Sequence, residues 1–206
     1  MPARRRPSKK TVEPALALID FSSIAIGIAA ADAMVKRAPI DVLRAGTVQP
    51  GRYLVLIGGS VADVGESLAA GREIGGDTVL GHVYLPHVHS EVVEAIGGGR
   101  VPDVHDALGI VETTTVSAAI HAADAGVKGA AVRLVEVRLA DGLGGKGIVL
   151  YSGLVADVEA AVEIGVGVLE QPASLVRQVV IPQLHTAMWE NVSDATRFSA
   201  RVLERL

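Results

Sequence analysis

The histidines near residue 85 are the first side chains whose spacing suggests chemistry. His82, His87 and His89 lie close together, but the period-two geometry of a strand and its exit puts His82 and His87 on opposite faces. Two histidines without a nearby pair of carboxylates provide too few ligands for a typical metal site. The sequence also contains no cysteine, which excludes thiolate ligands, cysteine nucleophiles and disulfides. We therefore expect no metal and no cofactor.

Two glycine-rich segments resemble phosphate-binding loops only in part. Residues 144–147 contain a Gly-Lys pair, but Ala140 and Gly147 stand where a phosphate loop needs its first glycine and its Ser or Thr. Residues 57–60 join an expected strand to an expected helix, whose N-terminus can bind an anion, but the full dinucleotide pattern is missing. A structural turn is the favoured interpretation. No nucleophile, base and orienting group stand at recognisable positions, so we expect no catalytic residues and no enzyme.

The composition narrows the class of protein further. Hydrophobic residues make up 50% of the chain, charged residues 20% and aromatic residues 3%, and the net charge is −4. These values favour a packed aliphatic core and argue against a basic or stacking nucleic-acid binder. No apolar stretch is long enough for a membrane-spanning helix, and the basic start of the chain lacks the apolar region of a secretory signal. We expect a cytoplasmic protein with neither a nucleic-acid nor a membrane partner.

The elements that must position any site are repeated along the chain. Three segment pairs align in order: 17–38 with 109–130, 51–68 with 145–162, and 85–89 with 181–185. In the first pair, eight of the 22 aligned residues are identical. The offset grows by two between Glu136 and Gly145, so the second copy carries two additional residues there. Ordered matches of this kind indicate a tandem duplication.

Each copy is expected to alternate strands and helices. In the first copy, hydrophobic periodicity and turn signals predict strands at 15–20, 41–45, 52–57 and 78–85, and helices that begin at Ser22 or Ser23, at Ser60 and at Ser90. The expected apolar helix faces are Ile24, Ile28, Ala31 and Val35, then Val61, Val64, Leu68 and Gly71. This order predicts an α/β (α+β) fold, in which helices cover each four-stranded, mostly antiparallel sheet.

Glycine and proline mark the joint between the copies at residues 97–103. We expect a basic, disordered tail at 1–14, a first domain at 15–100, and a second domain with a C-terminal extension at 101–206. In that extension, Phe198, Val202 and Leu206 recur at four-residue spacing, which predicts a helix that packs on its own domain.

Several motifs carry a family resemblance. Ala-Ala-Asp-Ala-x-Val-Lys occurs at 30–36 and 122–128, Ala-Leu-Gly-Ile-Val-Glu at 107–112, Gly-Gly-Ser-Val-Ala-Asp-Val at 58–64, and Pro-x-x-His at 86–89. In this order the motifs resemble bacterial microcompartment (BMC) shell proteins, specifically the tandem-domain type in unpermuted order. The resemblance covers nearly everything except 1–14 and the last ten or fifteen residues.

The resemblance implies two ferredoxin-like BMC domains and a homotrimer that imitates the hexamers of single-domain members. Such a pseudohexamer would be a structural tile of the shell facet. Its partners would be other shell proteins, both hexamers and pentamers, and encapsulated enzymes. A trimeric ferredoxin-like regulatory protein that binds a ligand at residues 58–60 or in an inter-subunit cleft is the alternative.

In the family, the loop between the second and third strands of each domain lines a central pore. The corresponding residues here are Gln49, Pro50 and Gly51 in the first copy and Gly142, Leu143, Gly144 and Gly145 in the second. Glycines allow a backbone to approach the axis and expose its N–H groups. The resemblance therefore implies a pore for small polar metabolites.

The family also carries a lysine along the seam between neighbouring tiles, which corresponds to Lys36 and Lys128. His87 and Gln183 stand where the family often has an arginine that docks across this seam. We expect these four residues at the assembly edge, with lateral contacts weakened or redirected by the missing arginine.

Overall fold

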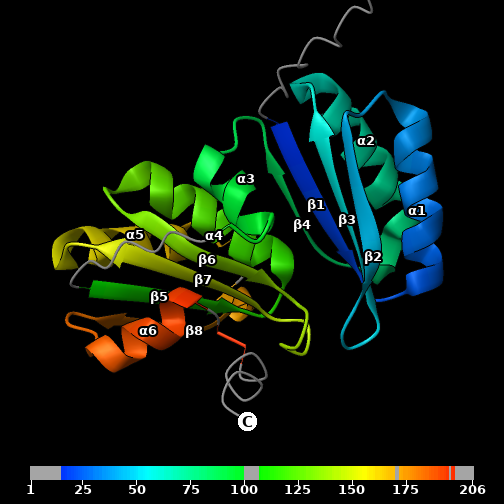
Figure 1. Ribbon diagram of the computed structural model, residues 1–206. Coiled ribbons are helices and arrows are strands. Elements are labelled where there is room, and N and C mark those ends of the chain that lie inside the picture. The colour runs from blue at the N-terminus through cyan, green and yellow to red at the C-terminus, as the bar shows by residue number, and fades with distance from the viewer. Residues whose placement is uncertain (1–14, 100–106, 170–171, 195, 198–206) are drawn as a thin grey trace, which may run out of the picture.

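The computed structural model describes residues 15–99, 107–169, 172–194, 196 and 197. It contains two similar domains side by side, each built on one four-stranded sheet (Figure 1). The predictions for the basic tail at 1–14, for part of the joint and for residues 198–206 lie outside the described residues.

The first domain comprises β1 (Ala15–Phe21), α1 (Ile24–Arg37), β2 (Val42–Val48), β3 (Arg52–Gly59), α2 (Val61–Gly75), β4 (Val79–Leu85) and α3 (Ser90–Ile96). A 3-10 turn, η1 (Gly76–Thr78), precedes β4. The strand order is β2-β3-β1-β4, and every ladder is antiparallel. This is the predicted order of elements, with α1 and α2 packed on one face of the sheet (Figure 1).

The second domain repeats the plan with β5 (Ala107–Thr113), α4 (Val116–Gly129), β6 (Arg133–Leu139), β7 (Gly147–Gly153), α5 (Val155–Gly167), η2 (Pro172–Ser174), β8 (Leu175–Ile181) and α6 (Thr186–Asp194). Its sheet has the matching order β6-β7-β5-β8, again antiparallel. The duplication in the sequence is therefore a duplication of the fold.

Local sequence signals fix where the helices begin. The Ser23 side chain accepts a hydrogen bond from the Ile26 amide at 3.3 Å and caps α1. Ser60 caps α2 by accepting from the Asp63 amide at 3.1 Å, while its hydroxyl donates to the Asp63 carboxylate. These contacts satisfy amides that would otherwise lack partners at the helix start.

Of the predicted apolar face of α1, only Ala31 is buried, and the prediction is wrong at the other three residues. Ile24, Ile28 and Val35 are exposed, and the buried face consists of Gly27, Ala30, Ala31 and Met34. The helix presents small residues to the sheet because the space is tight: a Cβ on Gly27 would lie 2.7 Å from the Tyr53 ring. In α2, likewise, Val61 is exposed while Val64, Leu68 and Gly71 are buried as predicted.

The two domains fill the space between their helices differently. In the first domain the Met34 side chain lies over Gly71, whose Cβ would meet the Met34 sulfur at 2.5 Å. In the second domain the residue corresponding to Met34 is Gly126, and the space above it is occupied by the ring of Tyr151. Tyr151 is fully buried, and its hydroxyl donates to the Ala122 carbonyl at 2.6 Å.

One hydrophobic cluster joins the domains. It contains Leu16, Leu18 and Val83 of the first sheet together with Val116 and Ile120 of α4. The helix α4 packs against β4, and α3 packs against β6. The two domains therefore form one body.

The strand ends differ slightly from the prediction. The strand β2 runs to Val48, so Thr47 and Val48 belong to the strand and the first hairpin loop is only Gln49–Gly51. The second hairpin loop, 140–146, is four residues longer than the first, because the inferred two-residue insertion adds to one residue less of strand on each side. Among the described residues, no helix is long and apolar enough to cross a membrane.

Candidate functional site

The two hairpin loops predicted to line a pore lie at the same end of the molecule (Figure 1). Gln49, Pro50 and Gly51 are exposed at the tip of the first loop, and the Gln49–Pro50 peptide is cis. In the second loop, Gly142 and Gly144 are exposed and Leu143 is half-buried. Both glycines have positive φ, which permits the tight path of this longer loop.

Arg52 ties the two loops together. Its Nη1 donates to the Gly145 carbonyl at 2.9 Å and to the Thr114 carbonyl at 3.3 Å, both in the second domain. The same nitrogen lies 3.3 Å from the Asp20 carboxylate in the first domain. Gly145 is buried beneath this guanidinium, where a Cβ would lie 2.6 Å from Cζ. A side chain at residue 145 would therefore displace the link between the loops.

Asp20 is a buried acid next to these loops. Its side chain has no exposed surface, and its Oδ1 has no hydrogen-bond partner among the described residues. Burial raises the pKa of Asp20 to about 6, although the nearby Arg52 charge acts in the opposite direction. The Asp20–Arg52 pair therefore contains a buried carboxylate, at the base of the first hairpin loop, of which only one oxygen is hydrogen-bonded among the described residues.

The second domain repeats this pair with different exposure. Lys146 Nζ lies 2.6 Å from the Glu112 carboxylate, and the repeat aligns Lys146 with Arg52 and Glu112 with Asp20. Both side chains are partly exposed. Sequence reasoning did not single out these ion pairs. The signal that could have found them was the recurrence of an acid and a base at equivalent ends of neighbouring strands.

The predicted edge residues fall into two groups. Lys128 Nζ donates to the His87 carbonyl of the first domain and also lies 2.5 Å from the Asp124 carboxylate. Asp124 in turn accepts from the His89 amide at 2.8 Å. Lys128 and His87 are thus joined to each other at the domain interface.

Lys36, the repeat counterpart of Lys128, is exposed and pairs with Asp32 at 2.6 Å. Gln183, the counterpart of His87, is also exposed. Inside the chain, Lys128 joins the second domain to the first. The equivalent residues, Lys36 and Gln183, are exposed on the outside of the chain and do not contact each other within it.

The hydrophobic surface has the same asymmetry. Ile28 on α1 is 53% exposed, whereas its counterpart Ile120 on α4 is fully buried against the first domain. On the opposite side, Val179 of β8 is 42% exposed, whereas its counterpart Val83 of β4 is 4% exposed. Each chain therefore has two exposed surfaces, one on α1 and one on β8. Their repeat counterparts, α4 and β4, pack against each other inside the chain.

Comparison with known proteins identifies the family. The BMC domain matches residues 15–88 and again residues 107–184. The chain belongs to the BMC-domain family. It is 39% identical over 178 residues to the bacterial microcompartment shell protein PduT from Citrobacter freundii, a match that covers 86% of this chain and 97% of PduT.

Solved structures agree with this assignment. A microcompartment protein from Desulfitobacterium hafniense has a TM-score of 0.74 and 43% identity, over 85% of this chain and 98% of that chain. A fused permuted hexameric shell protein from the RMM microcompartment has a TM-score of 0.53 and 22% identity, over 73% and 81% of the two chains, and shares the fold.

The BMC assignment confirms the fold and the class of protein predicted from the motifs. The chain is a microcompartment shell protein with two BMC domains, each with an antiparallel four-stranded sheet and helices. No group of three or more potential metal-ligating side chains gathers among the described residues.

Proposed function

We propose that three copies of this shell protein close into a ring that acts as a pseudohexameric tile with a central pore. The observation that carries this proposal is the asymmetric exposure of the two domains. Ile24, Ile28 and Val35 on α1 are exposed, while their α4 counterparts Val116, Ile120 and Val127 are buried. An exposed hydrophobic stripe on a helix indicates a protein contact.

The partner surface follows from the repeat. Within the chain, α4 packs on β4, and a Cβ on Gly81 would lie 2.5 Å from the Ser117 hydroxyl. The equivalent contact would place α1 of one copy on β8 of another. Such a contact is heterologous, because two different surfaces meet, and a heterologous contact closes into a ring when its rotation permits. Six domains of one plan, contributed by three chains, would complete the hexamer-like ring known in the family.

Polar contacts support the same arrangement. Lys128 reaches the His87 carbonyl inside the chain. In the ring, Lys36 would reach the carbonyl of Gln183 in a neighbouring copy, which is the repeat counterpart of His87. The ring would use at each junction between chains the same polar contact that already joins the two domains of one chain.

In such a ring the two hairpin loops would alternate around the axis. Gln49, Pro50 and Gly51 would alternate with the longer loop that contains Gly142, Leu143, Gly144 and Gly145. Because the two loops differ in length, the pore would have threefold symmetry. Its exposed backbone amides and the Gln49 amide favour small polar metabolites.

We assign the protein a structural and selective role rather than a catalytic one. It would sit in the shell of a cytoplasmic microcompartment beside hexameric and pentameric shell proteins, with encapsulated enzymes on the inner side. PduT is a shell protein, and this is the role proposed here by likeness to it. A ligand-binding regulatory role would instead require saturable binding of a nucleotide or another small molecule.

The ring is tested by replacing Ile28 with Asp and measuring the particle mass in solution. The native chain is expected at three times the chain mass of 21.3 kDa. Ile28→Asp is expected to yield monomers, because it buries an uncompensated charge at every junction. Leu154→Asp is the matched control, since Leu154 is also exposed but its counterpart Ser60 bonds within its own domain. A native monomer, or an Ile28→Asp trimer, would refute the ring.

The pore assignment is tested separately by cryo-electron microscopy of a Gln49→Trp variant. The bulkier side chain is expected to narrow the central opening, while the ring diameter stays the same. An opening of unchanged width would show that the loop of Gln49 does not line it.

A further inference from the structure

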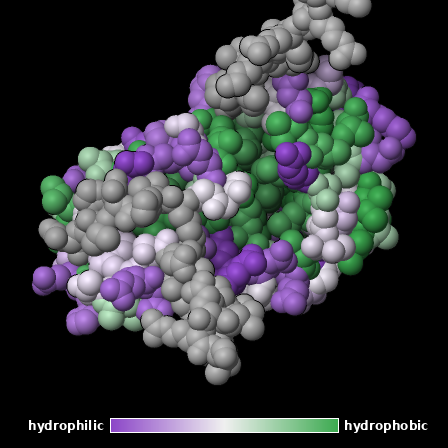
Figure 2. All heavy atoms as spheres, viewed as in Figure 1, coloured by the Kyte–Doolittle hydropathy of each residue, from purple (hydrophilic) through white to green (hydrophobic). Residues whose placement is uncertain are grey.

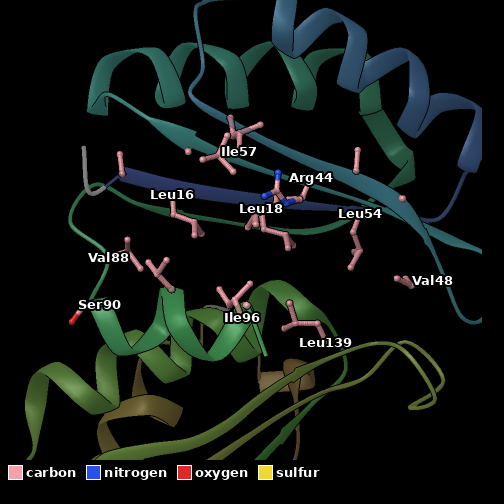
Figure 3. Close-up of a pocket in the computed structure, with 18 of the residues that line it drawn as sticks. Leu16, Leu18, Arg44, Val48, Leu54, Ile57, Val88, Ser90, Ile96 and Leu139 are labelled. Carbon is pink, nitrogen blue, oxygen red and sulfur yellow. The ribbon is translucent and has the colours of Figure 1, made fainter. Parts of the chain in front are cut away.

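Two hollows lie at the junction of the domains, and their linings differ in chemistry. The larger, of about 840 Å³, lies between the first sheet and α3, and Arg44 is the one charged side chain among its described lining residues (Figure 3). Figure 2 shows hydrophobic residues gathered in a hollow between the domains. The smaller, of about 460 Å³, lies between α2, β4 and the start of α4, and we call it the interdomain pocket. Apolar walls alone specify no ligand, whereas the lining of the interdomain pocket does.

Basic side chains gather in the interdomain pocket. Arg72 in the last turn of α2, His82 of β4 and His121 of α4 all line it, and no carboxylate does so among the described residues. The whole chain, by contrast, has a net charge of −4. A cleft lined by groups of one sign focuses the electric field and attracts ions of the opposite sign. The interdomain pocket is therefore suited to an anion.

Arg72 is the strongest anion-binding group in this pocket. It is exposed, and its side chain forms no hydrogen bond or ion pair with another described residue. Arg37 of α1, by comparison, already pairs with Glu66 of α2 at 2.7 Å. A guanidinium presents its donors in a planar fork that matches two oxygens of a phosphoryl group. Arg72 can therefore hold such a group without breaking an existing contact.

Two hydroxyl groups lie on the α4 side of the pocket. Thr115 Oγ1 and Ser117 Oγ are 3.2 Å apart, so one of their two protons lies between the two oxygens. Thr115 Oγ1 also accepts from the Ala118 amide at 3.3 Å. The second hydroxyl proton has no acceptor among the described residues and can be donated to a ligand.

The repeat shows that the fold does not need these basic side chains. The equivalent positions, which would meet at the junction between chains in a ring, carry no basic residue; they are Val166, Gln178 and Ala29. Both domains nevertheless have the same sheet order. The three positions are therefore basic only where they share the interdomain pocket, and the pocket would occur once in each chain.

We propose that the interdomain pocket binds a small phosphate ester, with Arg72, His82 and His121 around its phosphoryl group. A phosphoryl group offers three acceptor oxygens to these donors and to the hydroxyl pair, whereas a carboxylate offers two. The carbon part of the ligand would lie against Leu80 and Leu169, which also line the pocket. The volume of about 460 Å³ suits a small molecule. This proposal goes beyond the ring of three copies, because every group belongs to one chain.

Calorimetric titration with phenyl phosphate tests the pocket, because this probe joins a phosphoryl group to an apolar ring. We expect saturable binding at one site per chain. Arg72→Met should weaken the affinity about tenfold or more, since it removes a charged donor. The matched control is Arg44→Met, which changes the net charge equally at an exposed arginine of the larger hollow and should leave the affinity unchanged. No saturable binding to the native chain, or equal weakening by both replacements, would overturn the proposal.

A second probe and a second variant separate the ligand class from the ring. Benzoate carries a carboxylate in place of the phosphoryl group and should bind more weakly than phenyl phosphate; equal affinities would overturn the assignment to phosphate esters. The Ile28→Asp variant should bind phenyl phosphate as the native chain does, even as a monomer. Loss of binding in that monomer would show that the site needs a neighbouring copy and would overturn a site within one chain.

Nuclear magnetic resonance of the chain labelled with ¹⁵N-histidine locates the bound probe. Phenyl phosphate should shift the side-chain signals of His82 and His121. His185 serves as the internal control, because it lies exposed before α6 and does not line the pocket, and its signal should stay in place. Equal shifts of all three signals would indicate non-specific binding and would overturn the proposal.

Discussion

At the residue scale, Arg52 is the side chain on which the loop geometry depends most. Replacement with Met would leave Asp20 buried without its cation and Gly145 without its donor. We expect the free energy of unfolding to fall by about 2–4 kcal/mol. Lys146→Met is the control, because the Lys146–Glu112 pair is partly exposed and should contribute below about 1 kcal/mol. Urea denaturation measures both; equal losses would contradict this ranking.

Asp20 should also make stability depend on pH. Its folded pKa of about 6 lies above the ordinary value of 3.8, so the unfolded chain ionises first. The contribution of Asp20 to stability is therefore greatest below pH 4 and is lost as the pH rises from about 4 to 6. Asp20→Asn removes this dependence. The melting temperature of the native protein should fall relative to that of the variant across this window and then stay level; a constant difference would contradict the assignment.

At the element scale, the helix pair of each domain is packed around a different large side chain. Tyr151 over Gly126 in the second domain replaces Ile57 and Met34 in the first. Tyr151→Ile alone is expected to destabilise by about 3 kcal/mol through a cavity, and Gly126→Met alone by about 1–3 kcal/mol through overpacking.

The double variant should recover part of the summed loss, because Tyr151→Ile removes the ring from the space that the Met side chain needs, while the Ala161 carbonyl, 2.9 Å from the added Cβ, still has to shift. A double-mutant cycle in chemical denaturation measures this coupling. If the losses in unfolding free energy of the two single variants simply add, the side-chain packing of the first domain cannot be transferred to the second.

At the scale of the whole molecule, the shared cluster between α4 and the first sheet should make the two domains unfold together. Trp189 is the single tryptophan and reports on the second domain, whereas far-ultraviolet circular dichroism reports on both. We expect the two signals to give the same thermal midpoint. An earlier loss of Trp189 signal would indicate that the domains unfold independently.

Lateral assembly is a separate property of the whole molecule. Lys36 is exposed, whereas Lys128 already holds the His87 carbonyl inside the chain. In the proposed ring Lys36 lies at the junction between chains, so Lys36→Ala is expected to weaken the trimer and, through it, the extended sheets of trimers observed by negative-stain electron microscopy. Lys128→Ala should in addition weaken the domain interface and lower the melting temperature. Trimers and sheets of Lys36→Ala that are as stable as those of the native protein would show that this lysine does not hold the junction between chains.

The duplication, the order of elements, a helix cap at Ser22 or Ser23, the cap at Ser60 and the family could all be predicted from the amino-acid sequence. These depend on local signals, namely periodicity, capping chemistry and repeated motifs, which act within a few residues of one another. The two-residue insertion before Gly145 also followed from alignment of the repeat alone. The position of each hairpin loop could therefore be predicted, although its ends could not, because strand pairing extended β2 to Val48.

Which of two equivalent surfaces is buried could not be predicted from the sequence and is seen only in the folded chain. The same helical pattern gives exposed Ile28 and buried Ile120, because burial depends on what lies across the interface and not on the helix itself. The link from Arg52 to Gly145 joins residues of different domains and has no local signature. The helix α3 likewise packs on β6 of the second domain, whereas its repeat counterpart α6 packs on its own sheet through Trp189.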